Sequence, residues 1–321
     1  MPAPRREFAV IIPARDAKST ILPCLAAVLQ AYARVGGIAV TVVDNGSRDG
    51  TPDVVRAHFP DAVTVLDRPT LTVGALRNAG AAATDSEICC FVDADCVISL
   101  DWFERVRQVL SERRADAVGC YYALPALPTQ LETAWDRLHF PAQDGPAGMI
   151  NAGNFAVRRA IFAAAGGFSE ILPTGEDAEL CQRLADRGAV LWQDRSITAQ
   201  HLGNPRSLGA FFRKEYWHAL GALGTVRLGS LDRPFLMTLA FLATTAAGVG
   251  MILAGASPTA RLAGVAWFLA VPLVTVVYRG VMARRWPPIV LGVLLYWVYF
   301  AARAVALPAA WRLRRPALST S

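Results

Sequence analysis

The sequence predicts an α/β domain with a mainly parallel sheet, followed by C-terminal helices that cross a membrane. Two observations support this class. Short apolar runs typical of buried strands alternate with segments of helical spacing over most of the chain, the pattern of βαβ units. From Phe235 to Trp311, in contrast, there is no acidic residue. With 54% hydrophobic and 18% charged residues among 321, the composition excludes a disordered chain and a disulfide-rich miniprotein.

The first elements follow from the alternation of apolar runs with helical spacing. Pro13 ends the first apolar run, and Gly36-Gly37 interrupts the first helical segment. The loop from Asp44 to Thr51 consists of turn residues. The pattern predicts strands at Phe8–Pro13, Ile38–Val43, Val63–Leu66 and Glu87–Val92, with helices at Thr20–Arg34, Pro52–His58 and Val73–Ala82 between them.

The stretch from Gly119 to Asn204 is less regular. It predicts a loop at 151–155, a helix near 159–165, a helix after Gly175 and a strand at 189–192. The segment from Leu208 to Leu228 then mixes aromatic and aliphatic residues with basic ones. A helix of this kind either faces the protein core or lies in a membrane interface, and both interpretations stay open here.

The tail contains two uncharged stretches, Phe235–Ala254 with 20 residues and Leu262–Tyr278 with 17. About 20 apolar residues cross a bilayer core, so both are predicted to span it. A third stretch, Ile289–Trp311, is interrupted by Arg303 and Pro308. Its apolar length favours three spans, but a third span would export the basic residues that follow, against the positive-inside rule. The alternative is two spans, with the third stretch along the interface.

The chain is basic, with a formal net charge of +6. Much of the excess positive charge lies beside the apolar stretches, at Arg206, Arg213, Lys214, Arg227, Arg233, Arg279, Arg284 and Arg285. This distribution favours anionic lipid headgroups over nucleic acid as the partner. No long apolar leader begins the sequence, so we expect a multi-pass protein of the inner membrane with its soluble domain in the cytosol. The six cysteines form no CxxC pair and are predicted to be buried, reduced thiols.

Candidate ligand-binding residues follow the predicted strands. Asp93-Ala-Asp95 comes directly after the strand Glu87–Val92, and two carboxylates at a strand end suit a divalent cation with its phosphate ligands. A turn before a helix is the alternative. Asp44, also at a strand end, is a candidate acceptor of hydrogen bonds from a base or ribose. Arg77 either faces a diphosphate or is a solvated helix residue.

Further candidates lie in the less regular half. Glu176 and Asp177 begin a helix after Gly175, and acidic residues in a first turn commonly complement the helix dipole. In a domain that also binds metal and phosphate, such a carboxylate is a candidate general base. His201, after a predicted strand, is either a metal ligand or a structural histidine.

The order of these motifs resembles family-2 glycosyltransferases of the GT-A fold, a Rossmann-like α/β architecture. The resemblance covers about residues 7–230, and seven motifs in order make it specific. The matching strings are Val10-Ile-Ile-Pro-Ala-Arg-Asp, Val42-Val-Asp-Asn-Gly-Ser-Arg-Asp-Gly-Thr, Arg77-Asn-Ala-Gly, Phe91-Val-Asp-Ala-Asp, Asn151-Ala-Gly-Asn-Phe, Gly166-Gly-Phe and Gly175-Glu-Asp-Ala-Glu-Leu.

The resemblance implies inverting transfer of a sugar from a nucleoside-diphosphate donor. On this pattern Asp44 contacts the base, and Pro13, Ala14 and Arg15 line its pocket. Arg77 joins the residues that bind the donor.

The resemblance also implies a cofactor, Mg²⁺ or Mn²⁺. Asp95 binds it, Asp93 approaches the ribose or the metal, and His201 is a further metal ligand. Asp177 deprotonates the acceptor hydroxyl. Two residues are assigned to the acceptor side or to support of the site, Asn154 and Glu176.

Departures from the family pattern narrow the expected function. Many members have Asn-Glu where this chain has Asp16-Ala17, so one donor contact differs. Processive synthases carry Gln-x-x-Arg-Trp on an interfacial helix, whereas this chain has Arg213-Lys-Glu-Tyr-Trp217. All predicted spans also follow the catalytic domain. We therefore expect transfer of a single sugar and not polymerisation.

These inferences divide the chain into a GT-A catalytic domain at 1–206, an amphipathic interfacial region at 207–233, a transmembrane region of two to three helices at 234–312 and a basic tail at 313–321. The expected acceptor is a hydroxyl of a lipid-linked molecule or glycan at the cytosolic face. One alternative is a polyprenyl-phosphate glycosyl synthase, whose acceptor phosphate needs no deprotonation. The other is a non-catalytic membrane scaffold with a nucleotide-binding fold.

Overall fold

The structure is a computed structural model that describes residues 6–120, 122–139, 143–225, 233–255 and 257–313. The chain forms two compact units. Unit 1 comprises residues 1–125 and 142–203, and unit 2 comprises residues 126–141 and 204–321. The segment 126–141 therefore interrupts unit 1 in the sequence but belongs to the unit that contains the apolar tail.

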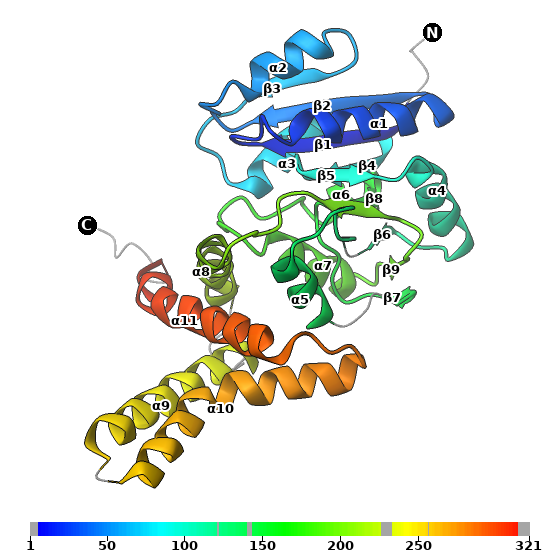
Figure 1. Cartoon of the computed structure of the whole chain (residues 1–321). Coiled ribbons are helices and arrows are strands. Elements are labelled where there is room, and N and C mark those ends of the chain that lie inside the picture. Colours follow the sequence, from blue (N-terminus) through cyan, green and yellow to red (C-terminus); the bar gives the residue numbers. More distant parts are fainter. Residues whose placement is uncertain (1–5, 121, 140–142, 226–232, 256, 314–321) are drawn as a thin grey trace, which may run out of the picture. The chain divides into compact units, whose positions relative to one another are not determined.

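Unit 1 is built on an eight-stranded sheet with the order β3-β2-β1-β4-β8-β6-β9-β7 (Figure 1). Its strands are β1 (Arg6–Ala14), β2 (Ile38–Asp44), β3 (Thr64–Asp67), β4 (Ser86–Val92), β6 (Ala117–Gly119), β7 (Gly145–Pro146), β8 (Asn154–Arg158) and β9 (Leu191–Gln193). The strands β3, β2, β1 and β4 pair in parallel, as predicted. From there the sheet is mixed, because β8 pairs antiparallel with both β4 and β6. The loop predicted at 151–155 is partly wrong, because its last two residues, Asn154 and Phe155, begin β8 and are buried between β4 and β6.

Helices cover both faces of this sheet. They are α1 (Ile21–Val35), α2 (Thr51–His58), α3 (Val73–Ala82), α4 (Trp102–Glu112), α6 (Arg159–Ala164) and α7 (Glu176–Asp186). One core packs Leu25 of α1 and Trp102 of α4 against the sheet, and the other packs Leu76 of α3 and Leu180 of α7 against the opposite face. The helices predicted near 20–34, 52–58, 73–82 and 159–165 are confirmed within two residues at each end.

A small second sheet, which the sequence pattern did not predict, lies next to the end of β4. It pairs β5 (Cys96–Ile98) antiparallel with β10 (Ala199–His201), so that Cys96 lies opposite His201. This pairing brings the end of the Asp93-Ala-Asp95 motif beside a histidine that is remote in sequence. The six cysteines are free and buried, as predicted.

Unit 2 is helical. It contains α5 (Gln130–Arg137), α8 (Leu208–Thr225), α9 (Arg233–Ala254), α10 (Pro258–Ala283) and α11 (Ile289–Leu313). The predicted amphipathic helix is α8, and the expected residues 226–228 at its end lie outside the described part of the chain. Three helices in the described part are long and apolar enough to cross a membrane, at Arg233–Ala254, Pro258–Ala283 and Ile289–Ala309.

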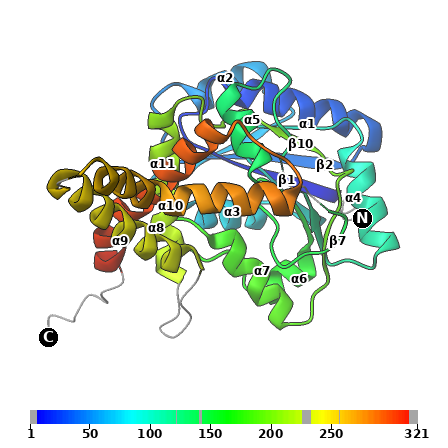
Figure 2. The same cartoon turned by 60° about the horizontal axis from the view of Figure 1, so that its bottom comes forward.

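Two of these helices, α9 and α10, form an antiparallel hairpin (Figures 1 and 2). They approach closely at a pair of glycines. A Cβ on Gly248 would lie 2.6 Å from the carbonyl oxygen of Gly264, and a Cβ on Gly264 would lie 2.8 Å from that of Gly248. Small residues that allow close backbone approach are typical of helix pairs in membranes.

Candidate active site

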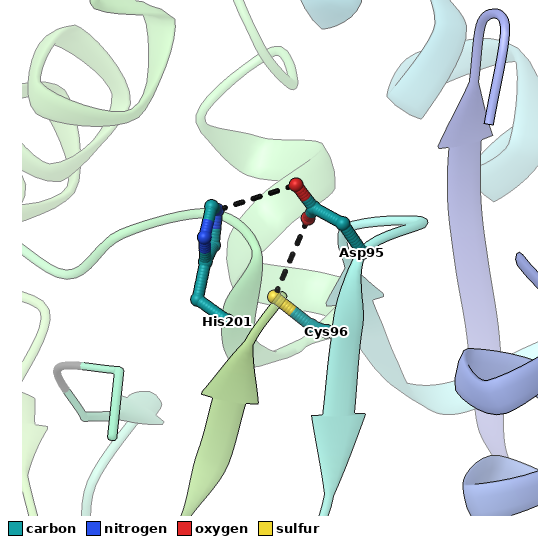
Figure 3. A group of neighbouring side chains, drawn as sticks. All are labelled: Asp95, Cys96 and His201. Carbon is teal, nitrogen blue, oxygen red and sulfur yellow. Dashed lines mark hydrogen bonds and ion pairs between the residues drawn. The ribbon is translucent and has the colours of Figure 1, made fainter. Parts of the chain in front are cut away.

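A potential metal centre lies at the start of the small sheet. Asp95, Cys96 and His201 each offer one ligand atom, and these atoms lie within 4.8 Å of one another. The His201 Nε2 is 3.5 Å from Asp95 Oδ2, and the Cys96 Sγ is 3.8 Å from Asp95 Oδ1. Figure 3 shows the three side chains converging from two different strands. The pairing of β5 with β10 therefore creates a site that neither segment contains alone.

The residues at this centre fit a divalent cation. Carboxylate oxygen and imidazole nitrogen together suit Mn²⁺, whereas oxygen ligands alone suit Mg²⁺. Burial, with Asp93 and Asp95 nearby, raises the pKa of the Cys96 thiol well above its ordinary value. Hard cations of this kind prefer oxygen and nitrogen to sulfur, so Asp95 and His201 are the natural ligands of the three. The backbone at residue 95 is fixed, because Leu202 N–H donates to the main-chain carbonyl of Asp95 at 2.8 Å. Position 203 requires glycine, since a Cβ there would lie 1.8 Å from Asp95 Oδ2.

A buried arginine links two other acidic residues of the predicted site. Arg77 is 3% exposed, and its two terminal nitrogens donate to Glu176 Oε1 at 2.5 Å and to Asp93 Oδ1 at 2.7 Å. Its guanidinium also lies over the ring of Phe168, 5.4 Å from the ring centre. Burial alone would lower the pKa of Arg77, but attraction to Asp93 and Glu176 outweighs it and raises the pKa. Arg77 thus fixes the end of β4 to the start of α7.

The two acidic residues at the start of α7 lie in different environments. Glu176 is buried, and burial raises its pKa above the ordinary value although Arg77 opposes that shift. Asp177 is half-buried, and its Oδ1 accepts only from the N–H of Ala178 among the contacts in the described residues. Successive helix residues point about 100° apart, so the two carboxylates face different directions. Of the two, Glu176 is paired with Arg77, whereas Asp177 belongs to no ion pair among the described residues.

Two residues that the sequence analysis missed contact Asp93. The hydroxyl of Tyr122 lies 3.5 Å from Asp93 Oδ2, and burial raises the pKa of this tyrosine well above its ordinary value. Gly153 approaches the same carboxylate so closely that a Cβ there would lie 2.2 Å from Asp93 Oδ2. The glycine is part of a motif that was visible in the sequence. Tyr122 had no local signal, because its contact with Asp93 spans 29 positions of the chain.

A third group of predicted residues lies at the ends of β1 and β2. Pro13 pairs with Val43 and Ala14 pairs with Asp44 across the two parallel strands. The Asp44 carboxylate is buried and accepts from the Ser47 hydroxyl at 2.5 Å and from the backbone N–H groups of residues 46 and 47 at 2.9 Å each. Arg15, in contrast, is exposed. Asp44 therefore organises its own loop and lies beside the segment predicted to line the donor pocket.

A comparison with protein families identifies the domain that carries these groups. The family described as glycosyl transferase family 2 matches residues 9–163, from β1 into α6, including the Asp93-Ala-Asp95 motif. Known glycosyltransferases also align with most of the chain. The chain contains a glycosyl transferase family 2 domain, and the known relatives that align with it are glycosyltransferases.

Two curated relatives of this family-2 glycosyltransferase align over most of its length. Glycosyltransferase AglE of Haloferax volcanii is 26% identical over 239 residues, covering 72% of this chain and 78% of the relative. Pre-mycofactocin glycosyltransferase of Mycobacterium tuberculosis is 28% identical over 251 residues, covering 73% of this chain. The alignment covers 50% of that relative, so this chain spans half the length of the mycobacterial protein.

Solved structures share the fold of this family-2 glycosyltransferase. Mannosyltransferase PcManGT from Pyrobaculum calidifontis, in complex with GDP-Man and Mn²⁺, superposes with a TM-score of 0.62 at 18% identity, over 98% of this chain and 89% of that chain. TarS 1-349 of S. aureus in complex with UDP gives a TM-score of 0.50 at 15% identity, over 94% of this chain and 92% of that chain. At these identities the likeness shows the fold alone. The predicted GT-A fold is confirmed.

The structure of this family-2 glycosyltransferase brings the predicted residues together in separate groups. Asp93, Arg77 and Glu176 are in direct contact, and Asp95 and His201 form the second group. Asn154 belongs to neither, because both of its amide hydrogens donate to carbonyl groups and its oxygen accepts from the Trp102 indole at 2.8 Å. That arrangement fits a supporting residue in the core. The roles assigned to the individual residues stay predictions.

Proposed function

We propose that this family-2 glycosyltransferase transfers a single sugar, with inversion, from a nucleoside-diphosphate sugar to a hydroxyl of a lipid-linked acceptor at the cytosolic membrane face. The observation that supports it most is the convergence of Asp95 and His201 beside the Arg77–Asp93–Glu176 cluster, in a chain that continues into three long apolar helices from Arg233 onward. A nucleotide sugar carries a diphosphate that needs a cation, and a lipid-linked acceptor needs an enzyme at the bilayer.

Asp95 and His201 are the residues that would hold Mn²⁺ or Mg²⁺. A cation held there would neutralise the negative charge that develops on the departing diphosphate. The GT-A neighbour from Pyrobaculum calidifontis contains GDP-Man with Mn²⁺, and the TarS neighbour contains UDP, which supports a nucleoside-diphosphate donor here. The base-binding side of the donor pocket is assigned to Pro13, Ala14 and Arg15 beside Asp44.

The protein's own residues then activate the acceptor. Asp177 is proposed as the base that takes the proton from the acceptor hydroxyl, because it is half-buried and has no cationic partner in the described structure. Glu176 is less suited, since its carboxylate is held by Arg77 at 2.5 Å. Arg77 would position the site by holding Asp93 on one side and the start of α7 on the other.

The activity is tested with a panel of nucleotide sugars offered to the purified full chain together with a membrane lipid extract. One donor is expected to label the lipid fraction.

Transfer should stop in excess EDTA and return with Mn²⁺ or Mg²⁺, and Asp95→Ala should behave as the chelated enzyme does. Full transfer in excess EDTA would contradict the metal assignment. Failure of every donor to label any acceptor would contradict the transferase assignment.

We also propose that α9 and α10 span the membrane and that α11 lies along the cytosolic interface with α8. Two observations within unit 2 support the placement of α11. Arg303 of α11 pairs with Glu215 of α8, with 3.8 Å between the charged atoms. Of the three apolar helices, α11 is the most buried, with 39% of its most apolar 18-residue stretch buried against 17% for α9 and 22% for α10. This placement keeps the basic residues after α11 on the cytosolic side.

The connection between α10 and α11 supports the same placement. Arg285 pairs with Asp136 of α5 at 2.5 Å, and Arg137 donates to the carbonyl of Trp286 at 3.3 Å. Because α5 is inserted between two stretches of unit 1, this connection belongs on the side of the membrane that carries unit 1. Both ends of the α9–α10 hairpin would then be cytosolic.

The topology predicts a defined labelling pattern in intact cells. A cysteine at position 257, between α9 and α10, should react with a membrane-impermeant maleimide, whereas one at the exposed position 111 of α4 should react only after permeabilisation. The unmodified chain should give little background because its six cysteines are buried. An epitope tag fused after Ser321 should be protected from external protease. Digestion of the tag in intact cells would contradict the interfacial placement of α11 and favour three spans.

A further inference from the structure

A polar pocket of about 290 Å³ lies inside unit 2, among α5, α8 and α11. None of the residues assigned to donor, metal or base lines it. The pocket combines an aromatic wall with charged groups, and its main lining residues are Trp135, Phe211, Lys214, Glu215, Tyr299 and Arg303. One of its helices, α11, is long and apolar enough to cross a membrane, and charged groups in such helices commonly mark a functional site.

The charges in this pocket leave an excess of positive charge. The Glu215 side chain is only 6% exposed, and it lies 3.8 Å from Arg303 and 3.5 Å from His218. The carboxylate is therefore already compensated by the arginine. Lys214 is half-buried at the pocket, and no carboxylate lies within ion-pair distance of it in the described part of the chain. An anion is consequently the ligand that balances the pocket.

The arginine has hydrogen-bond donors to spare. Its 3.8 Å approach to Glu215 is an ion pair that is too long for a hydrogen bond. Its Nε is buried and has no hydrogen-bond partner among the described residues. The guanidinium is instead held over the ring of Tyr299, 4.3 Å from the ring centre. A planar guanidinium with open donors is suited to bind phosphate oxygens in pairs.

The other wall of the pocket is apolar. Trp135 packs edge-on against Phe211 with 4.6 Å between ring centres, and Tyr299 adjoins Trp135 at 5.9 Å. A free inorganic phosphate makes no use of such a wall. A phosphate attached to a hydrocarbon chain fits both sides of the pocket. The chain covers the aromatic wall, and the phosphate contacts Lys214 and Arg303.

We propose that this pocket binds the phosphate headgroup of the lipid-linked acceptor, with Lys214 and Arg303 contacting the phosphate and Trp135 and Tyr299 contacting the first part of the lipid chain. That the bound lipid is the acceptor rests on the proposed function. Binding of a phosphate-bearing lipid does not, since it is measured without any sugar donor. The residues that hold the lipid thus differ from those that carry out the transfer.

The test measures equilibrium binding of farnesyl phosphate to the full chain in an uncharged detergent. Lys214→Gln should weaken binding about 10- to 100-fold, as expected for loss of one hydrogen bond between charged groups. Lys214 is half-buried and lacks a carboxylate partner, so this variant should fold. Arg303→Lys should also weaken binding, because lysine keeps a positive charge beside Glu215 but loses the paired donors.

The matched control is Arg213→Gln, which removes a positive charge from the neighbouring exposed residue of the same helix. It should leave binding unchanged, because Arg213 does not line the pocket. Farnesol should bind far more weakly than farnesyl phosphate, and inorganic phosphate should compete only at much higher concentration. Equal binding by wild type and Lys214→Gln, or an equal loss in Arg213→Gln, overturns the proposal. Competition by inorganic phosphate at the concentration of farnesyl phosphate overturns the assignment to a lipid.

Failure of this inference can be separated from failure of the proposed function. If the chain binds farnesyl phosphate through Lys214 but transfers sugar from no donor, the lipid-phosphate proposal is supported and the transferase assignment is contradicted. If it transfers sugar to lipid while Lys214→Gln binds farnesyl phosphate normally, only the pocket assignment falls.

Discussion

Replacing Asp177 with asparagine is expected to reduce sugar transfer by about 10²- to 10⁴-fold, the usual contribution of a general base. Asparagine keeps the size and most of the hydrogen bonding of the aspartate but cannot accept a proton. Asp177 is half-buried and belongs to no ion pair in the described structure, so the change should disturb the fold little. The rate is measured as transfer to the lipid acceptor with the donor identified by the panel.

Two comparisons show whether this loss reflects base catalysis. Donor affinity should hardly change in Asp177→Asn, because Asp44, Asp93 and Asp95 are the carboxylates assigned to the donor and its cation. Glu176→Gln should reduce the rate of sugar transfer much less, since a glutamine oxygen still accepts the hydrogen bond from Arg77. Near wild-type transfer by Asp177→Asn would rule out the hydroxyl mechanism. A phosphate acceptor, which is already ionised near neutral pH, would then be favoured.

Replacing Arg77 with methionine is expected to lower the free energy of unfolding of unit 1 by about 3–5 kcal/mol. Arg77 is 3% exposed and holds both Asp93 and Glu176, so its removal leaves carboxylates of like charge without a cation. Methionine fills the space of the side chain stem but compensates neither charge. The matched control is Arg105→Met, because Arg105 pairs with Asp101 on the surface, where such pairs contribute about 0.2–1 kcal/mol.

The cysteines make this measurement specific to unit 1. All six lie in the stretches 1–125 and 142–203, and all are buried. A thiol-reactive fluorophore therefore reports thermal unfolding of unit 1 without a contribution from the helical unit. For a domain of this size a loss of 3–5 kcal/mol corresponds to a midpoint lower by roughly 6–20 °C. A midpoint within 2 °C or so of the wild type would contradict the positioning role of Arg77.

The effect of pH on the Arg77→Met variant follows from the state of Glu176. Burial raises the pKa of this carboxyl, and Arg77 is the main group that opposes the shift. Without Arg77 the pKa should rise further. An acid whose folded pKa is raised stabilises the fold at low pH and loses that contribution as the pH rises through the folded pKa. The loss in free energy of unfolding of Arg77→Met relative to the wild type should therefore be greatest near neutral pH. It should become smaller as the solution is acidified toward the pKa of Glu176.

The residue pattern alone predicted the strands and helices of the parallel half of the sheet. Apolar runs ended by Pro13 and by the loop after Val43 predicted β1 and β2, and these strands pair in parallel as expected. The reason is local, since a strand that is buried on both faces must be continuously apolar and its polar continuation must fall at the sheet edge. The motif order resembling family 2 was likewise a property of the chain alone.

The contacts between the candidate site residues became visible in the folded structure alone. The pairing of Cys96 with His201 brings the histidine to Asp95, and the contacts of Arg77 span 16 residues to Asp93 and 99 to Glu176. No local pattern encodes such contacts, because they arise from non-local packing of the whole domain. The same holds for the helical unit. In the sequence Arg303 is an isolated charge in an apolar stretch, whereas in the structure it pairs with Glu215 of α8. A charge in an apolar helix is interpretable only with its partner, and the partner is chosen by packing.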